Sequence, residues 1–162
     1  MFKVKVKTPR TADIVNKIRG AVDDAFAYEV HREVVEKEIK PLIAAGVSPV
    51  DSRDGRRFKG YKDPNKYPGN RKEKRPVSLW LTGEMLSWYQ AWKVSGLRLR
   101  IGIHTAAPED VKTRAEANNV GVPKKNIVAR RFIPLRGEIF RVSIMRKLKE
   151  LYSKRIKAIL TK

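Results

Sequence analysis

Apolar and polar residues alternate at the start of the chain, where residues 2–7 read FKVKVK. A period of two predicts a short strand with one apolar and one basic face. Over residues 12–40 the apolar residues recur about every 3.6 positions, which predicts a long N-terminal helix. At about 1.5 Å per residue, that helix is longer than a domain of this size is wide. We therefore expect it to overhang the domain, to bend at Gly20 or to pack on a neighbouring copy.

The second half of the chain predicts shorter elements. Residues 83–89 have the pattern of a short helix, and residues 92–103 read as a β-hairpin with its turn at Ser95-Gly96. Residues 108–119 open with a proline and two acidic residues, which is typical of a helix N-terminus.

Residues 138–160 predict a final amphipathic helix. Its expected apolar stripe is Ile139, Val142, Met145 or Ile144, Leu148, Leu151, Tyr152, Ile156 and Ile159. Its other face is strongly basic and carries one acidic residue, Glu150. Together these elements predict an α+β fold in a single domain over residues 1–162. A small, mostly antiparallel sheet would pack against the long N-terminal helix and the C-terminal helix.

Residues 47–76 break the periodic pattern and predict a long basic loop or arm within the domain. The segment is rich in proline and glycine and has no sustained apolar period. Phe58, Tyr61 and Tyr67 are interleaved with its cations, so the aromatic rings could stack on bases while the cations contact phosphates. A generally positive surface beside nucleic acid, or anchoring of the rings on an adjacent protein, explains the pattern equally well. The candidate contacts to a DNA channel or a partner are Arg53, Arg56, Arg57, Lys59, Lys62, Lys66, Arg71, Lys72, Lys74 and Arg75.

The overall charge favours a polyanionic or acidic partner. The chain holds 37 lysines and arginines against 17 acidic residues, a net charge of +20. Charge of one sign at this density repels itself unless a partner neutralises it. The chain has no cysteine, which excludes disulfides, cysteine-ligated metals and thiol nucleophiles. No apolar stretch approaches the length of a membrane helix, and the first residues do not form a signal-peptide block, so we expect no membrane partner.

The residues suited to catalysis are few and scattered. His31 and His104 lack the spacing of a metal site, and we expect both to be structural. The acids between Glu29 and Glu38 are interspersed with Lys37 and Lys40, so a solvated, salt-bridged helix face explains them better than a nuclease centre does. We expect no enzyme activity, no metal and no cofactor, and keep a metal-dependent nuclease as a third alternative.

Two short motifs follow the long helix and the basic segment: LWLTGEML at residues 79–86 and, after Gly121, IVARRF at residues 127–132. In this order they resemble the tail-completion proteins of tailed bacteriophages, also described as tail-terminator, virion-morphogenesis or head–tail joining proteins. The resemblance covers roughly residues 77–145. It departs from the family pattern where Met85-Leu86 shifts the usual leucine by one position, and where Ala129-Arg130 stands in place of a Pro-Ala-Arg sequence.

The resemblance implies a structural virion protein of the phage neck. Such subunits form a ring, most often a hexamer, that completes the tail and joins it to the head around the DNA channel. The implied partners are tail-tube proteins, head-completion or connector proteins, and packaged DNA bound without sequence specificity. The implied location is the head–tail junction of the virion, and the host cytoplasm during assembly. The fold or interface positions are Leu81, Thr82, Gly83, Leu86, Arg130, Arg131 and Phe132.

Size and charge fit a ring independently of this resemblance. A domain this small cannot surround duplex DNA alone, whereas a closed cyclic assembly can. Because too many phosphate contacts would retain the DNA, we expect only part of the positive charge to line the channel. The main alternative is an accessory protein that binds nucleic acid without sequence specificity, as a monomer and with a steep loss of affinity in salt.

Overall fold

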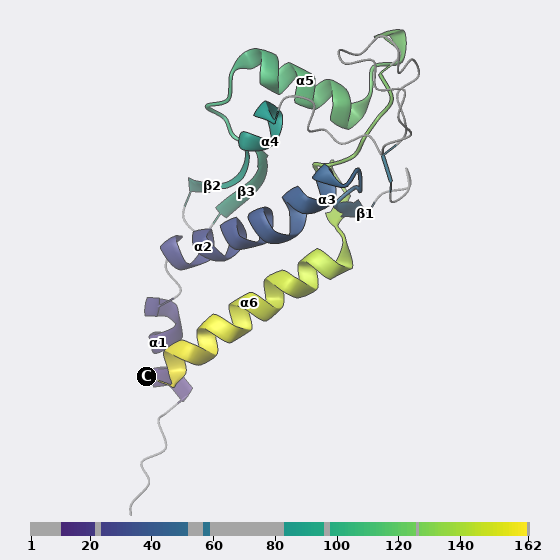
Figure 1. Ribbon diagram of the computed structural model, residues 1–162. Coiled ribbons are helices and arrows are strands. Elements are labelled where there is room, and N and C mark those ends of the chain that lie inside the picture. Colours follow the sequence, from purple (N-terminus) through teal and green to yellow (C-terminus); the bar gives the residue numbers. More distant parts are fainter. Residues whose placement is uncertain are drawn as a thin grey trace, which may run out of the picture.

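Helices and two small antiparallel sheets make up the structure, which confirms the predicted α+β class (Figure 1). The computed structural model describes residues 11–21, 24–51, 57–58, 83–95, 98–125 and 127–161. In chain order the elements are α1 (Thr11–Ala21), α2 (Asp24–Val34), the π-helix η1 (Val35–Ile39), α3 (Lys40–Ala44), β1 (Val50–Asp51), α4 (Glu84–Ser87), β2 (Tyr89–Ser95), β3 (Arg98–Ile103), α5 (Glu109–Val120), the 3₁₀ helix η3 (Pro123–Lys125), β4 (Ile139–Phe140) and α6 (Val142–Leu160). The strand predicted over residues 2–7 lies outside the described residues.

The N-terminal helical region is divided. α1 ends at Ala21 and α2 begins at Asp24, and the two helices run in different directions (Figure 1). The backbone then passes from α2 through η1 into α3 without leaving helical conformation. The prediction for residues 12–40 is therefore right about helical type, but a single straight helix of that length is not seen.

Pro41 explains the π-helical turn. Proline has no N–H to donate to the carbonyl four residues earlier, and its ring clashes with that carbonyl in a regular α-helix. The turn before it is widened by one residue, so that the Lys40 N–H donates to the carbonyl of Val35. Val35 and Ile39 both remain fully buried, so the wider turn keeps its apolar side chains in the core.

The predicted hairpin is confirmed and is longer than expected. β2 pairs antiparallel with β3, with Tyr89 opposite Ile103 and Ala91 opposite Ile101. Tyr89 and Ala91 are buried, while Gln90 between them is only half-buried, as a strand with one covered face requires. The helix predicted over residues 83–89 is wrong at its end, because α4 stops at Ser87 and Tyr89 already belongs to β2.

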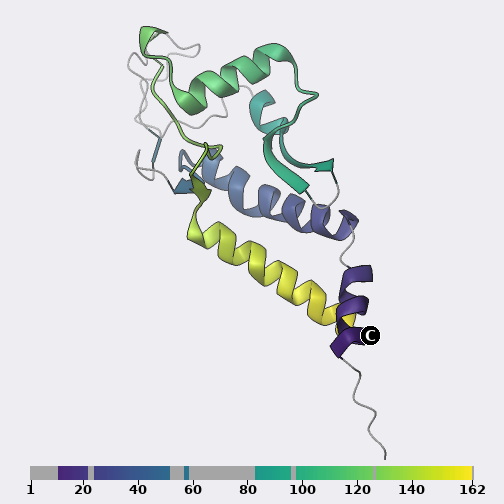
Figure 2. The ribbon, with the colours of Figure 1, turned by 180° about the vertical axis from the view of Figure 1, so that it is seen from behind.

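α2 is the central layer of the domain. The hairpin packs on one side of it and α6 on the other, and both views of the ribbon agree on this order (Figures 1 and 2). A helix covered on two sides needs apolar residues around much of its circumference, and α2 buries Ala27, Val30 and Val34. The core continues into the neighbouring elements through Ile39, Ile43, Leu86, Tyr89, Val111, Phe132 and Ile144.

The last helix begins later than the apolar pattern predicts. Residues 139–140 form β4 instead, which pairs with β1 so that Val50 lies opposite Phe140. Of the two alternatives for the stripe, Ile144 faces the core with 3% of its surface exposed, whereas Met145 is 45% exposed. The predicted stripe is wrong at Ile139 and Val142, which are 57% and 62% exposed. Ile139 belongs to β4, and Val142 lies on a side of α6 away from Ile144, which packs in the core.

Gly121, at the end of α5, allows a test of the close approach between its backbone and that of Ala129. Its φ of +85° and ψ of 152° are essentially restricted to glycine, and an added Cβ would lie 2.8 Å from the backbone nitrogen of Ala129. We expect Gly121→Ala to lower the free energy of unfolding by about 3 kcal/mol. Gly137 is the matched control, because its φ is +86° but an added Cβ meets nothing within 4 Å. Gly137→Ala should cost only about 1 kcal/mol, and equal losses in denaturant titrations would contradict the close approach at Gly121.

Candidate interaction surface

Most of the basic segment predicted as a contact surface lies outside the described residues. Of its ten cations, the structure describes only Arg57. The other nine lie outside the described residues: Arg53, Arg56, Lys59, Lys62, Lys66, Arg71, Lys72, Lys74 and Arg75. Arg57 is exposed and pairs through its backbone with Val47 in an isolated bridge. Phe58 is 8% exposed and packs in the core, so the prediction that its ring could stack on bases is wrong.

The two motifs supply several buried residues to the fold. Gly83 takes a φ of +70° at the N-cap of α4, where a left-handed backbone favours glycine. Leu86, Arg130 and Phe132 are buried, and Arg131 is half-buried. Leu81 and Thr82 lie outside the described residues. Each motif thus contributes buried side chains to the interior of the domain, whereas Glu84 remains exposed.

Asn119 connects α5 to the segment that contains Arg131 and Phe132. Its Oδ1 accepts hydrogen bonds from the backbone N–H groups of Phe132, at 2.8 Å, and Ile133, at 2.9 Å. Its Nδ2 donates to the carbonyl of Ile133 at 3.0 Å. The side chain is buried, so these bonds replace water that cannot reach it. Sequence reasoning missed this role, because Asn119 reads as an ordinary polar residue at a helix end.

Two further side chains hold the same segment from other elements. The Tyr89 hydroxyl on β2 donates to the carbonyl of Phe132 at 3.0 Å, and the two rings are in tilted contact. Burial raises the pKa of this phenol far above its usual value, so it remains a donor. The Ser48 hydroxyl, beside β1, donates to the carbonyl of Arg131 at 2.5 Å. Residues 131–133 thus join the hairpin, α5 and the β1 corner.

The two arginines of the motif bind groups at the end of α5. Arg130 donates to the Asn118 carboxamide at 3.1 Å, and Arg131 donates to the Asn119 carbonyl at 2.7 Å. Arg131 also forms an ion pair with Glu138 at 3.3 Å. A cation beside the last carbonyls of a helix is favourable because those carbonyls carry the negative end of the helix dipole. The structure thus places both arginines in contacts that hold the fold.

Both histidines make contacts within the fold, as expected. His31 Nδ1 lies 2.9 Å from the Ala27 carbonyl and 3.3 Å from the Tyr152 hydroxyl. His104 Nδ1 accepts the backbone N–H of Ala106. Within the described ranges, no three histidine or acidic side chains gather where they could hold a metal ion. No helix in this part of the chain combines the length and apolarity needed to cross a bilayer.

The predicted salt-bridged face on the N-terminal helices is confirmed. Lys37 lies 2.9 Å from Glu33, and Lys40 lies 2.7 Å from Glu36. Arg155 of α6 adds a second set of contacts, 2.7 Å to Glu29 and 3.2 Å to Glu33. The hydrogen bond from Lys37 and the nearby Arg155 lower the pKa of Glu33. The two contacts of Arg155 thus join α6 to α2.

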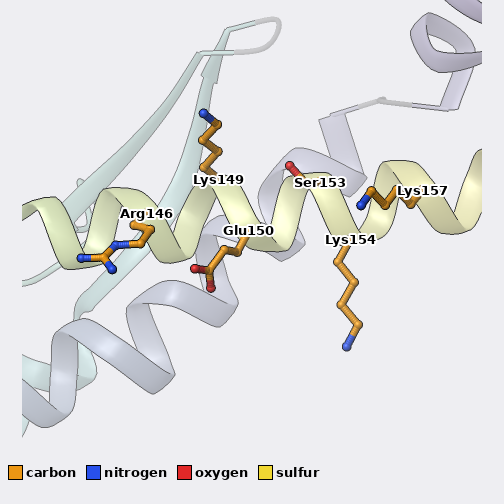
Figure 3. A pocket seen from close by; sticks show the side chains of 6 residues that line it. All are labelled: Arg146, Lys149, Glu150, Ser153, Lys154 and Lys157. Carbon is orange, nitrogen blue, oxygen red and sulfur yellow. The ribbon is translucent and has the colours of Figure 1, made fainter.

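The solvent-facing side of α6, called here the outer face, is strongly basic. Figure 3 shows its side chains spreading from one stretch of the helix. They border a shallow, open hollow of about 400 Å³, lined by Arg146, Lys149, Glu150, Ser153, Lys154 and Lys157. None of these four cations forms an ion pair with an acid among the described residues, whereas Glu150 lies 3.9 Å from Lys147. Such a surface can hold phosphate or carboxylate groups, but it contains no aromatic ring for base stacking.

Comparison with known proteins assigns no family to the chain. No protein-family model matches it, and no curated protein and no solved structure is similar enough to count as a match.

Replacing Asn119 tests whether its carboxamide holds the segment at residues 131–133. Asn119→Ala leaves two backbone N–H groups and one carbonyl without their partner, and we expect a loss of about 3 kcal/mol in the free energy of unfolding. Glu116→Ala, at an exposed position on the same helix, is the control and should change the free energy of unfolding by less than about 0.5 kcal/mol. A loss for Asn119→Ala no larger than that for Glu116→Ala in urea titrations would contradict this role.

The depressed pKa of Glu33 predicts a pH dependence of stability. Its contribution is fully present above the pKa of the unfolded chain and is lost as the pH falls through the lower folded value. We expect the wild-type free energy of unfolding to drop between about pH 5 and pH 3 more steeply than that of Glu33→Gln. Glu116→Gln, at an exposed position on α5, controls for the loss of one carboxylate. If both variants followed the wild-type curve, the ion pairs to Lys37 and Arg155 would not stabilise the fold.

Proposed function

We propose that this protein is a structural subunit of the neck of a tailed bacteriophage. In this proposal, copies of the chain close into a ring, most simply a hexamer, that completes the tail and joins it to the head around the DNA channel. The subunit catalyses no reaction and works by contact with its own copies, with tail-tube and head-completion proteins, and with passing DNA.

The observation that carries the proposal is a concentration of exposed apolar side chains where the chain enters α6. Leu135, Ile139, Val142 and Met145 are half of the exposed large apolar residues in the described part of the chain, within eleven positions. Val142 and Met145 are neighbours on the surface of α6, since residues three apart lie side by side on a helix. Apolar surface of this kind stabilises an assembly when another subunit covers it.

The position of the motifs supports the same proposal. In the implied family the residues corresponding to Arg130, Arg131 and Phe132 are structural, and here all three make interior contacts. A rigid interior connecting the hairpin, α5 and the β1 corner suits a subunit that must keep its shape within a ring. The second copy is the proposed occupant of the apolar surface, and a tail-tube or head-completion protein is the alternative outcome of the test below.

A specific observation favours a second candidate function. The basic outer face of α6 would also suit an accessory protein that binds nucleic acid as a monomer without sequence specificity. The two candidates differ in oligomeric state, which the following experiment measures.

Sedimentation or light scattering of the purified protein should give the mass of a closed oligomer, and electron micrographs should show rings that attach to tails. Val142→Glu with Met145→Glu should shift the protein to the monomer, because burying two carboxylates at an interface is strongly unfavourable. Val94→Glu with Val120→Glu is the matched control, since these two valines are also exposed but lie elsewhere on the surface. A wild-type protein that stays monomeric at all concentrations and never binds tails would refute the proposal.

A further inference from the structure

We infer that the outer face of α6 binds the phosphate backbone of duplex DNA, through Arg146, Lys149, Lys154 and Lys157. The inference deepens the proposed function by naming the residues that contact the DNA, and it rests on that proposal only for the idea that the duplex is packaged DNA. These residues are separate from the basic segment at residues 53–75.

The packing of α6 leaves these four cations in solvent. Ile144 is buried in the core, and Leu148 and Leu151 pack against it from the same side of the helix. Arg155 on this inner side is held by Glu29 and Glu33 of α2. With the helix fixed by both apolar and ionic contacts, its opposite side cannot turn inward. The outer face therefore presents its charges to whatever lies beside the molecule (Figure 3).

The state of these charges differs from that of the cations that lie beside acids on the helices of the domain. Four basic side chains on η1, α3 and α5 lie against acids: Lys37 with Glu33, Lys40 with Glu36, Lys112 with Glu109, and Arg114 with Glu84 and Asp110. The four cations of the outer face have no such partner among the described residues. Their electrostatic field extends into solvent. Binding of a polyanion to these cations is favoured because the counterions that screen the polyanion are released.

The dimensions of the face suit several phosphates of one strand. Arg146 and Lys157 are eleven positions apart, so their Cα atoms are about 16 Å apart along the helix axis. A duplex strand carries one phosphate per about 3.4 Å of its axis, so this span corresponds to about five nucleotide steps. Ser153, between the two ends, offers a hydroxyl that can donate to a phosphate oxygen.

The composition of the hollow favours DNA over an acidic protein and excludes base reading. The core of a protein interface is enriched in aromatic and apolar side chains, and none lines this hollow. Without an aromatic ring to stack or an amide to read a base edge, the contacts are limited to phosphate and sugar. Glu150 sits among the cations and repels a phosphate backbone, which weakens binding and suits DNA that must move past the surface.

The test compares two variants with the same loss of charge. In the outer-face variant, Arg146, Lys149, Lys154 and Lys157 are all replaced by glutamine. In the control variant, the acid-paired Lys37, Lys40, Lys112 and Arg114 are all replaced by glutamine. Fluorescence anisotropy with a labelled random-sequence duplex, and with a second duplex of unrelated sequence, measures affinity from low to moderate salt. Circular dichroism checks that each variant is folded.

We expect the slope of log affinity against log salt to become shallower by about 3.6 in the outer-face variant, at about 0.9 per phosphate contact, for both duplexes. The control variant should keep nearly the wild-type slope. Glu150→Gln should tighten binding roughly threefold. Equal loss in both quadruple variants would overturn the inference, since net charge alone would then explain binding. An unchanged salt slope in the outer-face variant would also overturn the inference. The same holds if the four substitutions weaken binding to polyglutamate but leave binding to DNA unchanged.

The oligomeric mass of the same samples separates this inference from the proposed function. A protein that forms rings but keeps its salt slope in the outer-face variant would refute the DNA contact and leave the ring proposal standing. A strict monomer in which the outer-face variant loses the slope would refute the ring and support the DNA contact.

Discussion

The hydrogen bonds between Asn119 and the backbone of Phe132 and Ile133 are the constraint on which the rest of the domain depends. They tie an irregular segment, which has no regular partner strand in the described structure, to the end of α5. Tyr89 and Ser48 bind the carbonyls of the same segment from the hairpin and from the corner beside β1. Because the side chains of Asn119, Tyr89 and Ser48 are buried, removing one of them leaves backbone groups without a hydrogen-bond partner and lowers stability. The irregular segment is thereby held to three other elements.

α2 gives the domain its layered form. It is covered by the hairpin on one side and by α6 on the other, and the widened turn at Pro41 carries its buried stripe on into α3 (Figures 1 and 2). On the α6 side the contact is both apolar and ionic, since Arg155 reaches Glu29 and Glu33 while Tyr152 contacts Phe26 and His31. This mixed contact fixes the direction in which each side of α6 points.

The placement of charge follows from that arrangement and connects the fold to the proposed function. Acids on α2, η1 and α5 neutralise the cations beside them, whereas the outer face of α6 keeps its positive field. Two of the exposed apolar residues, Val142 and Met145, lie in the first turn of the same helix, and Leu135 and Ile139 precede it. A subunit with an apolar surface for a neighbouring copy and a basic surface for a polyanion has both properties that a ring around DNA requires.

The amino-acid sequence by itself determined the element types that depend on local patterns. Alternation predicted the hairpin, Pro108 and the acids after it predicted the start of α5, and the i,i+4 spacing of Glu33 with Lys37 predicted a salt-bridged face. Tertiary structure alone decided which side of each element is covered. The period of α6 allowed either Ile144 or Met145 inside, and packing in the core selected Ile144.

The same limit applies to the candidate surface. Phe58 lies among cations in the sequence, as a base-stacking residue would, but its side chain packs in the core. Asn119 is typical of a polar residue near a helix end, but its side chain binds three backbone groups of another segment. The basic character of the last helix was evident from composition. Composition did not show that Arg155 forms ion pairs with α2 while the cations of the outer face remain in solvent. Sequence spacing defines which residues share a helix face. Only contacts between distant segments decide which of those residues are buried, neutralised or left for a partner.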